Sequence, residues 1–263
     1  KWLSTFNLVM AALLALAVFV LGPTVIIIDS FTNTLGSYLS EFVRMSLRMT
    51  PFRDSGWISG WTVFYWAWWV SWSPFVGLFI ARVSRGRTIR EFILGTVLAP
   101  TLAAFVWFSV FGGTALHLEI MQGVPLSEAV KADVSTALFA MFNALPWGAV
   151  MSFVATVLVL VFFVTSGDSA TLVLATMSHG GAENPPHRSK IIWGVLIAGI
   201  AAALLLAGGV QAVQTASIVF ALPFTVVVVL MAVALVRAIR ADWEADQKRQ
   251  RALRRRMEQL VQP

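Results

Sequence analysis

Residues 56–82 read GWISGWTVFYWAWWVSWSPFVGLFIAR and hold six of the eleven tryptophans of the chain. No charged residue lies between Gly56 and Arg82, and the segment exceeds the ~20 apolar residues that a helix needs to cross a bilayer. Tryptophans of membrane proteins usually lie at the two interfaces, whereas these rings continue through the middle of the segment. Such rings suit a path or pocket for a quaternary ammonium group, because aromatic faces attract a cation without a hydrogen bond.

The rings of this segment share one side of the predicted helix. At about 100° per residue they form one stripe about a third of the circumference wide, and only Trp66 points elsewhere. The common explanation of such a stripe is a packed seam between two helices, because rings fill volume well. Here Ser71, Ser73 and the helix-breaking Pro74 interrupt the same region, which is typical of a helix that lines a cavity. We therefore favour a lined cavity over a dry seam.

The composition of the chain indicates a membrane protein. Its 263 residues are 58% hydrophobic and 12% charged, and the mean hydropathy is +0.80, well outside the soluble range. The absence of cysteine excludes disulfides and thiolate metal sites. The sequence starts at Lys1 without a methionine or a signal peptide, so we expect a fragment that lacks an N-terminal half.

Apolar length places six membrane spans along an all-α chain. We expect them at residues 6–28, 57–81, 92–116, 147–177, 191–208 and 215–236. The first span should end in a loop at Asp29. Polar and apolar residues alternate at helical spacing over 36–49, which predicts an amphipathic helix at the membrane interface. This gives two parts: a transmembrane domain over 1–236 and a basic cytoplasmic helical tail over 237–263.

The distribution of basic residues predicts the orientation of these spans. A cytoplasmic C-terminus puts 15 of the 19 Lys and Arg residues on the inner side, in agreement with the positive-inside rule. The basic far end of the tail could dock on anionic lipid at ~1 kcal/mol per charge, or serve only as an orientation signal. The same two explanations apply to Arg82 and Arg85, which could gate the cytoplasmic side. Nucleic acid binding needs a basic soluble face, so we do not expect it.

Side-chain oxygens gather in the fourth span. Phe162, Thr165, Ser166 and Ser169 fall within ~100° of arc on an ideal helix. A hard cation such as sodium takes oxygen ligands, both hydroxyl and freed carbonyl, and a carboxylate near the membrane such as Asp168 is a functional candidate by default. Alternatively, the hydroxyls bond back to the preceding turn and Asp168 faces cytoplasmic water. The residues alone leave both explanations open.

Other classes of function lack their residues. His117, His179 and His187 lie at span ends or in loops without an i, i+4 pair, so we expect no transition-metal site and no cofactor. No serine has a nearby histidine within a span, which argues against an enzyme. A channel would need a continuous polar lining, whereas the polar atoms here form short patches beside aromatics.

Several segments together resemble the betaine/choline/carnitine transporter family. The most specific is 61–95, WTVFYWAWWVSWSPFVGLFIARVSRGRTIREFILG. The segments 3–24 (LSTFNLVMAALLALAVFVLGPT), 110–115 (VFGGTA) and 162–170 (FFVTSGDSA) are similar to the family in the same order. The likeness extends to about residue 236 and is greatest to sodium-coupled glycine betaine transporters of actinobacterial type, with the choline-specific branch a near second.

The resemblance implies a fold of two inverted five-helix repeats in a bacterial cytoplasmic membrane. This chain would supply the last helix of the first repeat, the amphipathic connecting helix and all five helices of the second repeat. In the family the connecting helix lies at a trimer interface, so a homotrimer is expected. The basic tail of relatives senses osmotic stress, a role that this shorter tail could share.

The resemblance also implies a function and its residues. The family's secondary active transporters import glycine betaine or related trimethylammonium osmolytes by sodium symport with alternating access. Trp69 would belong to an aromatic box, Trp68 and Trp72 would line the cytoplasmic side of the pathway, and Trp66 would lie close by. The lack of an acidic residue between Asp54 and Glu91 fits a zwitterion, because a carboxylate would disfavour the carboxylate of betaine.

Two sodium sites follow from the same resemblance. Phe75 would lie beside one sodium ion, and the other would be bound by the hydroxyls of Thr165 and Ser166 and the carbonyl of Phe162. Some members of the family use protons or exchange substrates, so a proton-coupled choline transporter or a substrate exchanger is the alternative.

Overall fold

The chain folds into helices joined by short turns. The structure, a computed structural model, describes residues 2–50, 52, 56–182 and 184–261, and no strand occurs among them. The helices form two compact units. The first unit comprises Lys1–Met49 and Arg82–Gly194, and the second comprises Thr50–Ala81 and Val195–Pro263.

Two helices at the start of the first unit meet at a sharp elbow. Helix α1 covers Trp2–Leu21 and α2 covers Thr24–Ser46. Pro23 separates them because proline lacks an N–H group and keeps the residue before it out of the helical region. A Cβ atom on Gly22 would lie 2.6 Å from the Val18 carbonyl oxygen and 3.3 Å from the Thr114 hydroxyl. The elbow therefore packs tightly on the helix that carries Thr114.

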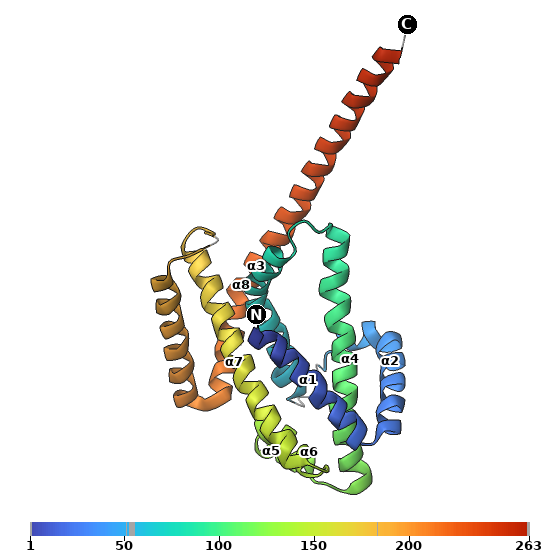
Figure 1. The fold of residues 1–263 in the computed structure, drawn as a ribbon, viewed down its shortest axis with the longest axis vertical. Helices are drawn as coiled ribbons and strands as arrows, with labels where there is room; N and C mark the ends of the chain where they lie inside the picture. Colours follow the sequence, from blue (N-terminus) through green and yellow to red (C-terminus); the bar gives the residue numbers. More distant parts are fainter. Residues whose placement is uncertain (1, 51, 53–55, 183, 262–263) are drawn as a thin grey trace. The chain divides into compact units, whose positions relative to one another are not determined.

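That helix is α4, Ile89–Gln122, which lies along both α1 and α2 (Figure 1). Its first turn is closed by a capping box: the Thr88 hydroxyl accepts from the Glu91 amide, and the Glu91 carboxylate accepts from the Thr88 amide at 2.9 Å. Its last turn ends at Gly123, which takes a left-handed conformation with φ 69°. Both ends of α4 are therefore specified locally by the sequence.

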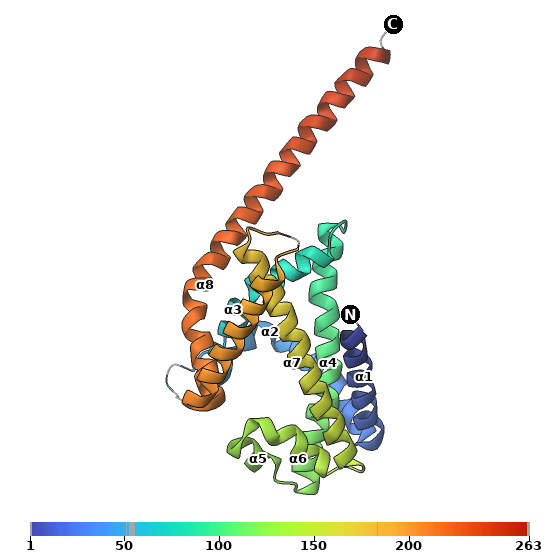
Figure 2. The same cartoon turned by 60° about the vertical axis from the view of Figure 1, so that its left-hand side comes forward.

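Three short helices connect α4 to the next long helix. They are α5 (Leu126–Ala132), the 3₁₀ turn η2 (Val134–Thr136) and α6 (Ala137–Asn143). They gather at the start of α7, Gly148–Ser178 (Figure 2). The Glu119 carboxylate fastens α5 to α4 by accepting hydrogen bonds from the amide and the hydroxyl of Ser127 at 2.8 and 2.6 Å.

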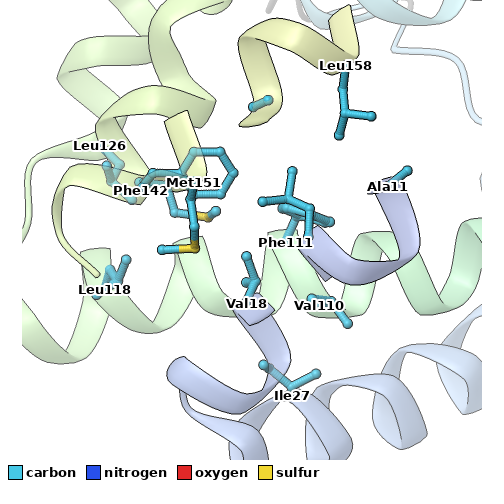
Figure 3. Packing of buried hydrophobic residues seen from close by; sticks show 13 residues of the cluster. Ala11, Val18, Ile27, Val110, Phe111, Leu118, Leu126, Phe142, Met151 and Leu158 are labelled. Carbon is cyan, nitrogen blue, oxygen red and sulfur yellow. The ribbon is translucent and has the colours of Figure 1, made fainter. Parts of the chain in front are cut away.

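The first unit has one apolar core between α1, α4, α6 and α7. Figure 3 shows its side chains, with Phe142 and Leu118 among the most completely buried. Its other members come from the same four helices and from the starts of α2 and α5: Ala11, Leu14, Val18, Ile27, Val110, Phe111, Leu126, Met141, Met151, Ala155 and Leu158. This core holds α1 beside α7.

The second unit carries the tryptophan-rich segment. It begins with a π-helical turn, η1 (Ile58–Val63), which continues as α3 (Phe64–Val83). The last helix, α8 (His187–Val261), consists of two helices joined at Gly208 and Gly209, where Gly209 has φ 63°. The Ser71 hydroxyl bonds to the Ser217 carbonyl oxygen at 3.1 Å, and Ala67 and Ala221 are buried. The hydrogen bond from Ser71 is the point at which α3 meets α8.

These helices agree with the expectation of an all-helical membrane protein. Within the described residues five helices are long and apolar enough to cross a membrane, namely α1, the combined η1 and α3, α4, α7 and α8. Because α8 is two helices that meet at Gly208 and Gly209, five of the six predicted spans each correspond to a helix, whereas the first, 6–28, crosses the bend at Pro23 and includes the start of α2. The predicted break near residue 208 is confirmed.

Three details of the prediction are wrong. Asp29 does not lie in a loop but inside α2, because the chain already bends at Pro23. The amphipathic segment 36–49 is not a separate helix; most of it is the second half of α2, which ends at Ser46. The third span is longer than 92–116, because the capping box starts α4 at Ile89 and Gly123 ends it.

Candidate substrate and cation sites

Seven rings of the second unit form a continuous series of contacts, called here the aromatic chain: Trp57, Trp61, Phe64, Tyr65, Trp68, Trp69 and Trp72. Trp61 stacks on Tyr65 with centroids 6.0 Å apart, and Phe64 stacks on Trp68 at 6.1 Å. At the far end, Trp69 and Trp72 meet edge to face at 5.5 Å. Each ring therefore limits the rotation of its neighbour.

Trp69 and Trp72 of the aromatic chain lie away from the point where α3 meets α8. The Ser71 hydroxyl, which bonds to α8, marks that point. At about 100° per residue, Trp72 and Trp69 lie roughly 100° and 160° around the helix from Ser71, whereas Phe64 lies within roughly 20° of it and Trp68 roughly 60°. Trp69 keeps 58% of its surface exposed. Within the second unit, Trp69 and Trp72 are therefore not part of the contact between α3 and α8.

The structure modifies the predicted helical stripe at its start. The segment Ile58–Val63 is π-helical, so the ideal angles used for Trp57 and Trp61 do not apply there. Stacking still joins these two rings, at 5.5 Å, to the rest of the chain. Trp66 is 66% exposed, and within the described residues its ring contacts no other ring. Phe75 is half-buried on α3, beyond Pro74.

Thr165, Ser166 and Ser169 of the first unit, called here the hydroxyl patch, lie in a continuous stretch of α7. The Thr165 hydroxyl donates to the carbonyl oxygens of Val161 and Phe162 at 2.9 and 3.1 Å, and the Ser169 hydroxyl donates to the Thr165 carbonyl oxygen at 2.9 Å. The local bonding that the sequence left open is therefore present. A hydroxyl that donates its only hydrogen keeps its oxygen lone pairs as acceptors, so these bonds are compatible with a cation ligand.

The other predicted residues differ in their exposure. Ser166 and Asp168 are exposed on α7, whereas Thr165 is half-buried. Arg85 is exposed in the turn between α3 and α4. The side chain of Arg82 lies outside the described part of the chain. No group of three or more His, Asp or Glu side chains that could hold a metal ion occurs among the described residues.

One polar residue that the sequence did not single out is Asn7, in the middle of the apolar run of α1. It is 2% exposed, and neither Oδ1 nor Nδ2 has a hydrogen-bond partner. The signal in the sequence was an amide between Phe6 and Leu8, but its burial depends on the helices that pack on α1, of which α4 and α7 lie far along the chain.

Comparison with known proteins gives the family of the chain. The model of a family described as betaine/carnitine/choline family transporter matches residues 1–244. The chain belongs to this family. The predicted membership of the betaine/carnitine/choline family is therefore confirmed, and the expectation that the chain is not an enzyme agrees with a family of transporters.

Individual relatives cover nearly all of the chain. The ectoine/hydroxyectoine transporter of Virgibacillus pantothenticus is 46% identical over 251 residues, which is 95% of this chain and 50% of the relative. The glycine betaine transporter OpuD of Bacillus subtilis is 46% identical over 241 residues, 91% of the chain and 46% of the relative. The glycine betaine transporter of Acinetobacter baylyi is 45% identical over 243 residues, 92% and 37% respectively. The chain thus spans half or less of the length of these relatives.

Proposed function

We propose that this chain is the substrate- and cation-binding part of a secondary transporter. The transporter imports glycine betaine, or a related trimethylammonium osmolyte, by sodium symport with alternating access. The observation that carries the proposal is the aromatic chain: its rings contact one another, and Trp69 and Trp72 lie away from the Ser71 contact with α8. The names of relatives, which include glycine betaine and ectoine transporters, support this substrate class.

The chemistry of the rings fits a trimethylammonium group. That group carries a permanent charge and no N–H, so a carboxylate could bind it but could not select a zwitterion over choline. Each ring–cation contact contributes ~0.5–2 kcal/mol, so four rings at the upper end of this range supply about 8 kcal/mol, which corresponds to micromolar affinity. Trp69 is the proposed box residue, Trp68 and Trp72 line the pathway on the cytoplasmic side, and Trp66 lies beside it. No acidic residue occurs between Asp54 and Glu91 to compete for the cation.

Sodium is the proposed coupling ion. Its site on α7 consists of the Phe162 carbonyl and the hydroxyls of Thr165 and Ser166, and Phe75 belongs to a second site. The hydrogen bonds of Thr165 support the first assignment, because both run to carbonyl oxygens and leave the hydroxyl oxygen free to accept. Asp168, Arg82 and Arg85 are proposed as gating or regulatory groups rather than ligands.

The larger architecture belongs to the same proposal. We expect two inverted five-helix repeats, of which this chain holds α1 as the last helix of the first repeat and α3, α4, α7 and both parts of α8 as the second. The second half of α2 would connect the repeats and lie at a homotrimer interface. The C-terminus would be cytoplasmic in a bacterial inner membrane, with residues 237–263 contacting anionic lipid.

Uptake into proteoliposomes tests this function. The intact transporter is reconstituted, the membrane potential is clamped, and labelled glycine betaine uptake is measured with an inward sodium gradient or with potassium in its place. Choline is the competitor. Uptake that depends on sodium and resists choline supports the proposal. Uptake driven by a proton gradient and blocked by choline would instead assign the chain to the choline branch of the family.

A matched pair of variants tests the sodium ligands. Thr165→Val keeps the shape of the side chain and removes its oxygen, and Thr165→Ser keeps the oxygen. We expect Thr165→Val to raise the sodium concentration needed for half-maximal uptake by about tenfold, the equivalent of ~1.4 kcal/mol, and Thr165→Ser to change it little. Equal sodium dependence in both variants would remove Thr165 from the site.

A further inference from the structure

Asn7 is a buried polar side chain without a partner in an otherwise apolar seam. Its exposure is 2%, and both amide atoms lack a hydrogen bond. An amide left unpaired in this way costs ~1–3 kcal/mol, and no water replaces the lost partner inside hydrocarbon. A ligand that is absent from this structure would remove that cost.

The register of α1 on α7 places Asn7 beside the hydroxyl patch. The buried residues of α1 are Asn7, Ala11, Leu14 and Val18. The matching residues of α7 run the opposite way, and Figure 3 shows Ala11 near Leu158 and Val18 near Met151. The buried residues of α1 are spaced by four, three and four residues. The buried residues of α7 between Met151 and Leu158 follow the same spacing in the opposite direction, and one more turn of α7 continues the series to Phe162. This register places Asn7 at the level of Phe162.

The direction of the side chains brings the amide closer still. Cβ atoms of an α-helix tilt toward its N-terminus, so Asn7 leans toward the start of α1. In this antiparallel pair, that direction leads from the level of Phe162 toward Thr165. At about 100° per residue, Phe162, Thr165 and Ser166 lie within roughly 80° of Leu158 on the α7 surface. Thr165, which is half-buried, therefore lies on the face of α7 on which α1 packs, and Phe162 and Ser166, which are exposed, lie at the edge of that face.

We propose that Oδ1 of Asn7 is a further ligand of the sodium ion held by the Phe162 carbonyl and the Thr165 and Ser166 hydroxyls. This inference rests on the proposed sodium symport. Three oxygens from one helix face cannot enclose a hard cation, which also needs oxygen from a facing element. Asn7 supplies that oxygen from α1. The ion would then join α1 to α7, so sodium binding would favour the arrangement in which the two helices stay packed.

The test measures sodium binding rather than transport. The intact protein in detergent is titrated with sodium chloride, and potassium chloride without choline keeps the ionic strength constant. The unfolding temperature is recorded at each sodium concentration. Asn7→Leu removes both polar atoms at similar size. Leu14→Ala, two turns away on the same seam, is the matched control for loosened packing. We expect Asn7→Leu to weaken sodium binding by about tenfold or more and Leu14→Ala to leave the sodium affinity unchanged.

A second variant gives a signature that packing cannot produce. Asn7→Asp keeps an oxygen at the same place, so it should retain the sodium affinity that Asn7→Leu loses, whereas a packing defect would affect both variants. This variant and Asn7→Ala decide the question if Asn7→Leu does not fold.

The outcomes separate the two proposals. The role of Asn7 is overturned, and the symport left intact, if the unchanged protein responds to sodium and Asn7→Leu binds sodium with equal affinity, or if Asn7→Asp loses as much affinity as Asn7→Leu. If the unchanged protein shows no sodium response, both proposals fail.

Discussion

Replacing Trp69 by leucine separates substrate binding from ring packing. Trp69 contacts Trp72 at 5.5 Å and Trp68 at 6.5 Å. Each ring pair contributes ~0.5–1.5 kcal/mol to stability, and this loss is the same with and without substrate. The ring–cation contact exists only in the complex and is worth ~0.5–2 kcal/mol. Trp69→Leu should therefore weaken glycine betaine binding by about 2- to 30-fold and separately lower the unfolding temperature of the free protein.

Binding to the purified transporter, measured by calorimetry at saturating sodium, gives the first quantity, and thermal unfolding without substrate gives the second. Trp69→Phe keeps a smaller ring, so its dissociation constant for glycine betaine should lie between those of the unchanged protein and Trp69→Leu. Phe79→Leu is the control, because Phe79 is an exposed aromatic residue of the same helix, outside the aromatic chain. An unchanged dissociation constant in Trp69→Leu, or an equal loss in Phe79→Leu, would refute a role of the Trp69 ring in cation binding.

Three further predictions concern the scaffold and the tail. A Cβ on Gly148 would lie 2.1 Å from the Phe142 carbonyl oxygen, so Gly148→Ala should destabilise the detergent-solubilised protein by ~1–3 kcal/mol, whereas Gly112→Ala, with open space around it, should not. Hydrogen bonds from the side chain and the amide of Ser135 hold the pKa of Asp133 below its ordinary 3.8. In hydrogen exchange, the Ser135 amide should therefore stay protected while the Asp133 carboxylate is ionised and lose this protection as pH falls through the lowered pKa. Asp133→Asn should abolish this pH dependence. Deleting residues 248–263 should remove the dependence of uptake on anionic lipid, and uptake that still follows the anionic fraction of the liposomes would exclude docking of the tail.

The sequence predicts the membrane helices well and their ends less well. Apolar length alone places all the spans, because the bilayer demands it. The elbow at Pro23 was missed because the apolar residues continue on both sides of it, and hydropathy does not register a bend. The π-helical turn Ile58–Val63 was missed for a similar reason: its composition is that of the α-helix that follows.

The site is harder to predict because its residues depend on distant partners. The stripe of rings follows from helical spacing, but the face that packs on α8 is set by Ala67 and Ser71 together with residues about 150 positions away. For the hydroxyls of α7 the sequence allowed both local bonding and cation binding, and the structure shows the local bonds of Thr165. Asn7 was overlooked because a single amide in an apolar run gives no sign of whether another helix will bury it.

The orientation of α3 connects its packing to the proposed function. Lipid tails are as apolar as leucine, so the hydrophobic effect does not decide which side of a membrane helix meets another helix. Close approach and hydrogen bonding decide it, and Ser71 provides a hydrogen bond toward α8 beside the small residue Ala67. Bulky rings on that side would hold the helices apart. The small residues therefore leave the tryptophans on the remaining surface of α3, where mutual stacking fixes them before any ligand binds. Rings fixed in advance lose little conformational entropy on binding a cation, which is the physical reason to place the substrate on this face.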